Sequence, residues 1–153
     1  MEQNILNNIE KLYRNHIITA VIVIALVVAV ILVTVGVLKF KLIASKSGRI
    51  IIAILVLMGS ILLLVLQFNS FYPIHKDYKE NSYIILENTE VVIMESSSSN
   101  AGIDYTNQVI VVSNGIEYEL TMQTDHALST GRKYNGTIAY LKHSKYLVWY
   151  DFD

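Results

Sequence analysis

Two long uncharged runs constrain the fold of this chain more than any other feature of its sequence. The first, residues 17–38, has 22 residues, of which 16 are Ile, Leu or Val. The second, residues 50–66, has 17 residues, of which 13 are Ile, Leu or Val. A 22-residue helix is roughly 33 Å long, which is enough to cross the roughly 30 Å hydrocarbon core of a bilayer. The β-branched side chains favour strands in water, but inside lipid a helix satisfies its own backbone groups. The sequence therefore predicts two transmembrane helices, residues 17–38 and 50–68, and argues against a cytosolic enzyme.

The connection between the two runs, residues 39–49, is basic. It contains no acidic residue and four cationic ones, namely Lys39, Lys41, Lys46 and Arg49. Short cytoplasmic loops of membrane proteins are enriched in Lys and Arg, whereas the flanks on the other side are not. We therefore expect these four residues to set the topology, with the loop in the cytoplasm and both termini outside the cytoplasmic membrane.

Small side chains in the two runs predict how the helices pack. Ala25 and Ala29 form a small-xxx-small pair in the first run, and Ala53 and Ser60 share one face of the second. Such residues allow helix backbones to approach closely in lipid. We expect them to pack the two spans as a hairpin; the alternative is that the same faces bind a partner helix or a second copy. Neither span has an ionisable residue between its ends, so the hairpin is expected to be an anchor and not a transport path.

The segments that flank the two spans are predicted to lie at the membrane surface. Residues 1–16 have the apolar spacing of an amphipathic helix, which either lies at the interface or simply extends the first span; the residues are Ile5, Ile9, Leu12 and Tyr13. Residues 69–80 begin with aromatic side chains typical of an interfacial belt. Because Pro73 lacks a backbone N–H, we expect the second helix to end there and an interfacial linker to follow.

The remainder of the chain is acidic and alternates as strands do. Residues 74–153 have six basic and eleven acidic side chains, a net charge of −5, whereas residues 1–73 have a net charge of +4; the two add to the −1 of the whole chain. An acidic domain has no electrostatic attraction for nucleic acid. Residues 116–122 alternate between apolar and polar, and Asn114-Gly115 joins them to the strand 109–112 through the sequence of a type I′ turn.

Further strands complete a predicted all-β domain over residues 81–153. They are residues 83–94, as one strand bent near Asn88 or as two short strands, then residues 134–141 and 146–152. Between the third and fourth strands, Asp125 can cap a single helical turn that ends at Gly131. This order predicts an OB-like five-stranded barrel, with an SH3-like barrel or an open sandwich as the alternatives.

The sequence contains no recognisable reaction centre. The chain has no Cys, which excludes disulfides, thiolate metal sites and cysteine nucleophiles. It also lacks a Gly-rich phosphate loop and a paired-His metal motif. The available candidates are His75, His143 and the pair Asp125 and His126, which as neighbours in a strand would point apart. We predict no catalytic residue, no metal ligand and no cofactor; an envelope hydrolase or metal enzyme would be revealed by loss of activity on substitution of His126 and His143.

Two segments are candidates for contact with a partner. The Ser-rich loop 95–108 contains Ile103 and Tyr105, and loops of this length often bind partners. The terminal strand is apolar on both faces and includes Tyr146, Trp149 and Tyr150. It is interpreted as a central strand, as a strand at the membrane surface, or as one covered by another subunit, because Trp and Tyr are enriched in interfaces.

The sequence as a whole predicts a non-enzymatic, membrane-anchored interaction protein. The β domain would be displayed outside the cytoplasmic membrane of a bacterium and would bind a protein or envelope component as an accessory or immunity-type protein. Its expected partners are the lipid bilayer and another membrane or envelope protein, in a homo- or hetero-oligomer, and not nucleic acid. The alternative is a structural subunit of a larger secretion or transport complex that acts through the transmembrane hairpin.

Overall fold

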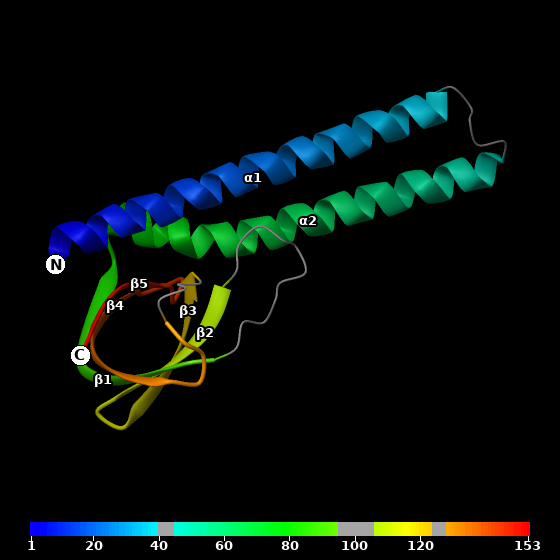
Figure 1. The fold of residues 1–153 in the computed structure, drawn as a ribbon. Coiled ribbons are helices and arrows are strands. Elements are labelled where there is room, and N and C mark those ends of the chain that lie inside the picture. The colour runs from blue at the N-terminus through cyan, green and yellow to red at the C-terminus, as the bar shows by residue number, and fades with distance from the viewer. Residues whose placement is uncertain (40–44, 95–105, 124–127) are drawn as a thin grey trace. The chain divides into compact units, whose positions relative to one another are not determined.

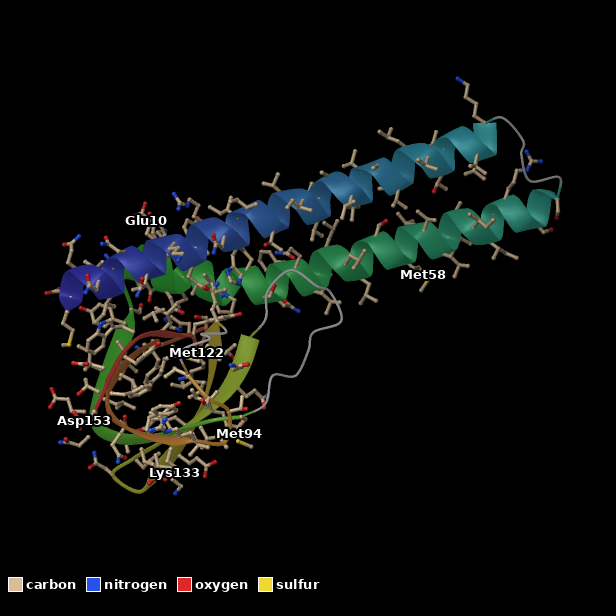
Figure 2. All side chains as sticks on the ribbon, viewed as in Figure 1. Glu10, Met58, Met94, Met122, Lys133 and Asp153 are labelled. Atoms are coloured by element: carbon tan, nitrogen blue, oxygen red, sulfur yellow. The ribbon has the colours of Figure 1, made fainter. Side chains whose placement is uncertain are left out.

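The computed structural model describes residues 1–39, 45–94, 106–123 and 128–153. Its first two elements are long helices, α1 (Glu2–Lys39) and α2 (Lys46–Glu80) (Figure 1). Each contains a stretch long and apolar enough to cross a membrane, and only 6% of each stretch is buried. Most apolar side chains in these stretches are therefore exposed on the helix surface. Met58 on α2, for example, is 63% exposed (Figure 2).

Helix α1 runs without interruption from Glu2 through the first apolar run. Residues 2–16 are therefore part of the same helix as this run. At the other end of the hairpin, Ser45 caps α2: its Oγ accepts a hydrogen bond from the backbone N–H of Gly48 at 3.3 Å.

Pro73 lies inside α2, so the expectation that the helix ends there was wrong. Helix α2 continues to Glu80 and includes all of residues 69–80, which were expected to form a linker. Proline removes one helical hydrogen bond, and that loss is offset when the helix beyond it is packed against other elements. The helix beyond Pro73 is packed in this way, since Ile74 is 2% exposed and Asp77 is fully buried.

The chain divides into two compact units. One unit is the helical hairpin, residues 13–72. The other unit combines both ends of the chain, residues 1–12 and residues 73–153, and contains the whole sheet. We refer to the second as the β unit.

Five antiparallel strands form one sheet in the order β3-β2-β1-β4-β5. The strands are β1 (Tyr83–Ile93), β2 (Thr106–Ser113), β3 (Ile116–Gln123), β4 (Lys133–Leu141) and β5 (Leu147–Phe152). The sheet is strongly curved (Figure 1), and Thr121 on the edge strand β3 forms an isolated parallel bridge with Tyr146, the residue before β5. The predicted five strands are thus confirmed, as a curved sheet that is not closed by a continuous ladder.

The tight turn between β2 and β3 has the predicted geometry. Asn114 and Gly115 both have positive φ angles, 53° and 76°, as a type I′ turn requires. The turn sets the register, in which Ser113 pairs with Ile116 and Val111 pairs with Tyr118.

Strand β1 is one long strand with a bulge at the position where a bend was expected. Its register with β4 shifts between Leu86 and Thr89, and Asn88 between them has a φ of 51°. The hydroxyl of Thr89, which is 1% exposed, donates a hydrogen bond of 3.0 Å to the carbonyl oxygen of Gly136 on β4. Gly136 has no room for a side chain, because an added Cβ would overlap the carbonyl oxygen of Asp151 on β5.

The side chains on the inner face of the sheet form the hydrophobic core of the β unit. Its members are Val91, Ile93, Val109, Val111, Leu120, Met122, Ile138, Tyr140 and Leu147. Alternation along each strand places these residues on one face. The half-buried tyrosines Tyr118, Tyr134 and Tyr150 pack against this core, as expected for aromatic side chains on a curved sheet.

A second buried group explains why β5 is apolar on both faces. Leu147 is in the core, whereas its neighbour Val148 points to the opposite face and is still only 8% exposed. The side-chain amide of Asn8 on α1 donates a hydrogen bond of 2.7 Å to the carbonyl oxygen of Val148. Ile5 and Ile9, on the same part of α1, are 0% and 2% exposed. The chain's own first helical turns therefore lie against β5.

Candidate functional site

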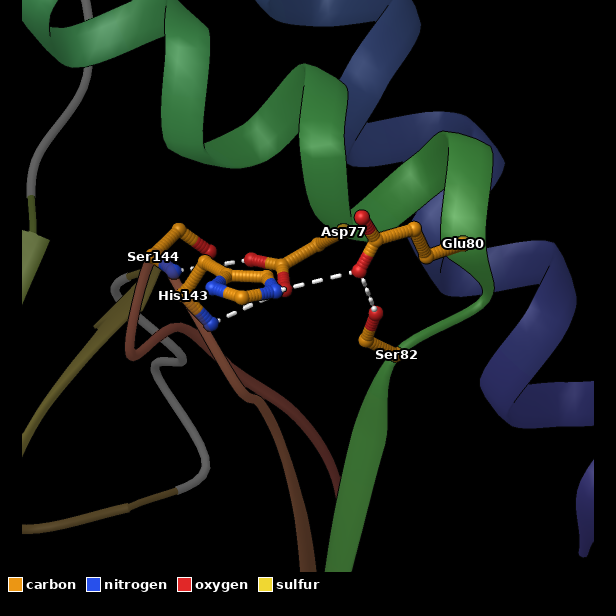
Figure 3. Close-up of polar contacts among 5 residues, drawn as sticks. All are labelled: Asp77, Glu80, Ser82, His143 and Ser144. Carbon is orange, nitrogen blue, oxygen red and sulfur yellow. Dashed lines mark hydrogen bonds and ion pairs between the residues drawn. The ribbon is translucent and has the colours of Figure 1, made fainter.

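A polar network joins the last turns of α2 to the turn between β4 and β5 (Figure 3). We call its five residues, Asp77, Glu80, Ser82, His143 and Ser144, the helix–turn junction. The carboxylate of Asp77 accepts hydrogen bonds from two backbone N–H groups, that of His143 at 2.9 Å and that of Ser144 at 2.7 Å. Because Asp77 is fully buried, these charge-assisted bonds satisfy a carboxylate that burial would otherwise destabilise.

Backbone hydrogen bonds around the helix–turn junction hold the same two segments together. The N–H of Ser82 donates to the carbonyl oxygen of Asp77 at 3.0 Å, and the N–H of Lys142 donates to that of Ser82 at 3.1 Å. Lys145 lies at the end of the β4–β5 turn and has a positive φ of 60°. Its N–H donates a hydrogen bond of 3.1 Å to the carbonyl oxygen of Leu141. The turn is therefore fixed both internally and against the helix.

Glu80 forms the exposed side of the helix–turn junction. One of its oxygens, Oε2, accepts hydrogen bonds from the imidazole Nε2 of His143 at 3.2 Å and from the hydroxyl of Ser82 at 3.1 Å. An ionised carboxylate is only an acceptor, so Nε2 of His143 carries the proton in this contact. The His143 hydrogen bond, followed by that of Ser82, lowers the pKa of the Glu80 carboxyl below its ordinary value.

The helix–turn junction contains serine, histidine and acidic side chains, but their connections differ from those of a hydrolase triad. In a triad, the serine hydroxyl donates to the imidazole and the acid orients the imidazole from its other side. Here the hydroxyl of Ser82 donates to Glu80, and Glu80 also accepts from His143. The hydroxyl of Ser144 is buried and has no partner among the described residues. The geometry fits a clamp that fixes the turn.

A small depression lies on the outer face of β2 and β3. Its volume is about 190 Å³, and its lining includes Met94, Gln108, Ile110, Glu119 and Thr121. These side chains combine an amide, a carboxylate and a hydroxyl with two apolar groups. Pockets for drug-sized ligands have volumes of roughly 300–1,000 Å³, so this depression is smaller than such a pocket.

Two aromatic residues of the terminal strand, Tyr150 and Phe152, pack against the core. The Tyr150 ring stacks on Phe152 with centroids 4.7 Å apart, and Phe152 stacks on Tyr134 at 5.2 Å. Tyr150 thus belongs to the border of the core, while Tyr146 and Trp149 are half-buried. Ile103 and Tyr105, the candidates in the loop, lie outside the described residues.

In the helical hairpin, the small residues of α1 and those of α2 differ in burial. Ser60 is 6% exposed and Ala53 is half-buried, so both lie on the more buried face of α2. Ala25 and Ala29 are exposed. Within the apolar run of α1 the buried residue is Val27, at 6% exposed, which lies about half a turn from these two alanines.

The basic residues that were expected to set the topology are partly described. Lys39 is exposed in the last turn of α1, where a cation is favourable for the helix dipole. Arg49 is half-buried in the first turns of α2, and its Nε has no hydrogen-bond partner among the described residues. Lys46 begins α2, and Lys41 lies outside the described residues.

The histidines do not form a metal site within the part of the chain that the structure describes. No group of three His, Cys, Asp or Glu side chains there is arranged to hold a metal ion. His143 is in the helix–turn junction and His75 is on α2, whereas Asp125 and His126 lie outside the described residues.

Sequence reasoning missed the role of Asp77. The local signal in the sequence is the three-residue spacing of Ile74 and Asp77, which places them on one face of a helix, but Pro73 argued against any helix there. No protein-family model, curated protein or solved structure matches this chain. Its function is therefore inferred from the geometry described above.

Proposed function

We propose that this chain is a non-enzymatic, membrane-anchored interaction protein whose β unit binds a protein or an envelope component, as an accessory or immunity-type protein. The observation that carries this proposal is the continuity of α2. The helix contains an apolar stretch long enough to cross a membrane, and its last turns are built into the β unit through Asp77. Such an element holds a folded binding module at a membrane.

We further propose that the β unit is a barrel of the OB type. This type is a partly open, five-stranded Greek-key barrel. The strand order β3-β2-β1-β4-β5 and the parallel bridge between Thr121 on β3 and Tyr146, the residue before β5, support this assignment.

In the proposed topology the loop between α1 and α2 is cytoplasmic and the β unit is outside a bacterial cytoplasmic membrane. Four basic residues in the short segment 39–49 support it. Because the chain has no native Cys, the test is labelling of single cysteines with a membrane-impermeant maleimide in intact cells. We expect Asp153→Cys to react and Ser45→Cys to react only after permeabilisation. The reverse pattern would contradict this topology.

The binding function is tested by exchange of both spans. The partner is first identified by crosslinking the native chain in cells, and residues 17–38 and 50–66 are then replaced by unrelated apolar helices. We expect the exchanged chain to retain the partner, because the β unit is unchanged. If the native chain crosslinks to no protein or envelope component, the proposed function is wrong.

One observation favours a second candidate, a structural subunit of a larger secretion or transport complex that acts through its helices. Two apolar grooves of about 570 and 310 Å³ lie between α1 and α2, one lined by residues such as Ile24, Leu64 and Phe68, the other by residues such as Val27 and Ser60. Apolar side chains of a neighbouring helix can pack into grooves of this kind. Loss of the partner after the exchange of both spans would favour this candidate.

A further inference from the structure

The edge of β3 has backbone hydrogen-bonding groups that point away from the sheet. The N–H of Thr121 donates to the carbonyl oxygen of Lys145, 3.0 Å away on the side opposite β2. Residues two apart in a strand direct their backbone groups to the same side. The N–H and C=O groups of Glu119 and Glu117 therefore also point away from β2, and they have no backbone partner among the described residues. We call these four groups the β3 edge.

The side chains along the β3 edge are acidic and accessible. Glu117 and Glu119 are both exposed on the outer face of the strand, opposite the core residues Leu120 and Met122. Glu119 also lines the 190 Å³ depression, together with the hydroxyl of Thr121 and the amide of Gln108. The strand thus offers main-chain donors and acceptors, two carboxylates on one face, and room for one side chain beside them.

We propose that the β3 edge binds an extended segment of a partner protein that has Lys or Arg at alternate positions. An added strand would pair with the N–H and C=O groups of Glu117 and Glu119, as in recognition by β-augmentation. The residues of the added strand that lie directly opposite Glu117 and Glu119 would have their side chains on the same outer face of the sheet. A Lys or Arg at each of these positions would form an ion pair with the carboxylate. This proposal rests on the proposed function and names the site and the partner class.

The negative charge of the β3 edge favours a basic segment of a partner protein as the added strand, and disfavours the β3 strand of a second copy of this chain. If two β3 strands paired with each other, their glutamates would lie close together on one face, and like charges there are unfavourable. Charged side chains on an edge strand are a known protection against self-pairing. A basic segment converts the same two carboxylates into favourable pairs.

The test uses the full chain in vesicles or nanodiscs of uncharged lipid. The probe is a peptide of about eight residues in which lysine and valine alternate. This length is enough for one strand. Two matched peptides serve as controls: one has glutamate in place of lysine, and the other keeps the lysine–valine sequence but has N-methylated backbone amides at its lysines. The N-methylated peptide has the same charge and lacks the N–H groups that would point at the β3 edge, because residues directly opposite one another in an antiparallel ladder exchange their backbone hydrogen bonds.

We expect the lysine–valine peptide to bind and to protect the amides of Glu117 and Glu119 from hydrogen exchange. The double variant Glu117→Lys/Glu119→Lys should weaken its binding by about tenfold or more and favour the glutamate peptide. Glu87→Lys, at an exposed position on β1, is the matched control and should leave binding nearly unchanged. Fluorescence of Trp149, the only Trp, confirms that each variant is folded.

Several results would overturn the proposal. They are equal binding of the lysine–valine peptide and its N-methylated form, amide protection elsewhere than on β3, an unchanged affinity in the double variant, and no binding of any peptide. The failure of this proposal is distinguishable from that of the proposed function. If the crosslinked partner binds the double variant as well as the native chain, the β3 edge is wrong and the proposed function stands. If no partner crosslinks but the peptide protects β3, the proposed function is wrong and the β3 edge stands.

Discussion

The carboxylate of Asp77 on α2 accepts a 2.7 Å hydrogen bond from the backbone N–H of Ser144, 67 residues further along the chain. This bond, with the neighbouring one from His143, fixes the β4–β5 turn against the end of the helix. The two N–H groups belong to a turn, where they have no strand partner, so the carboxylate satisfies donors that would otherwise be unpaired on folding.

Replacement of Asp77 is expected to destabilise the β unit strongly. Asp77→Ala removes two charge-assisted hydrogen bonds and leaves two donors without an acceptor, which should lower the free energy of unfolding by about 3 kcal/mol. Asp77→Asn retains one acceptor and directs an NH₂ group at the other donor, for a loss of about 2 kcal/mol. The measurement is urea unfolding followed by the fluorescence of Trp149. Asp151→Asn, at an exposed position, is the control, and an equal effect of Asp151→Asn and Asp77→Asn would contradict the role assigned to Asp77.

Glu80 should contribute a pH-dependent part of the stability. Its pKa in the folded chain is lowered by hydrogen bonds from His143 and Ser82, so the folded state binds fewer protons than the unfolded state. The contribution is therefore present above the ordinary carboxyl pKa of 4.5 and is lost as the pH falls through the lower, folded value. We expect native chain and Glu80→Gln to differ in stability at neutral pH and to converge once the pH falls below the lowered pKa of Glu80. Glu87→Gln is the matched control. A difference between native chain and Glu80→Gln that does not change with pH would show that the ionised form of Glu80 is not what stabilises the turn.

Gly136 should not tolerate a side chain. In Gly136→Ala the new methyl group would overlap the carbonyl oxygen of Asp151 and lie 2.9 Å from the Cα of Phe152, both of which are backbone atoms that cannot rotate away. We expect a loss of about 1–3 kcal/mol, measured by the same urea unfolding. Gly59→Ala, which meets no atom within 4 Å, should have little effect on the unfolding of the β unit. Full stability of Gly136→Ala would mean that β4 and β5 lie further apart than described.

The first turns of α1 should stabilise the β unit although they belong to a different part of the sequence. Ile9→Ala removes a side chain that is 2% exposed, and truncation of a buried Ile costs about 2–5 kcal/mol. Ile18→Ala, on the same helix at a position that is 52% exposed, is the control and should leave the unfolding of the β unit unchanged. Similar effects of the two variants would exclude packing of the N-terminal turns in the β unit.

Elements with a strong local signal were predictable from the sequence. The two apolar runs predict helices because lipid or close packing is the only environment for so many adjacent Ile, Leu and Val side chains. Asn114-Gly115 predicts its turn because both residues adopt positive φ angles at little cost, and the structure confirms this. The bend in β1 at Asn88 follows from the same property of asparagine.

The features that the sequence did not predict depend on contacts between distant segments. Pro73 is a local signal for the end of a helix, but burial of Ile74 and Asp77 against other elements extends the helix past it. The apolar outer face of β5 is covered by residues about 140 positions earlier, as the Asn8–Val148 hydrogen bond shows. The helix–turn junction likewise joins residues more than 60 positions apart, and no local pattern marks such a pair.

The division of the β unit between the two ends of the chain imposes an order on biosynthesis. Asn8 leaves the ribosome long before Val148 exists, and both apolar stretches are translated in the interval between them. The first helical turns therefore lack their contact with β5 until the last strand has been synthesised. A chain that ends before β5 cannot form the Asn8–Val148 hydrogen bond, so the β unit is complete only when the last strand has been synthesised.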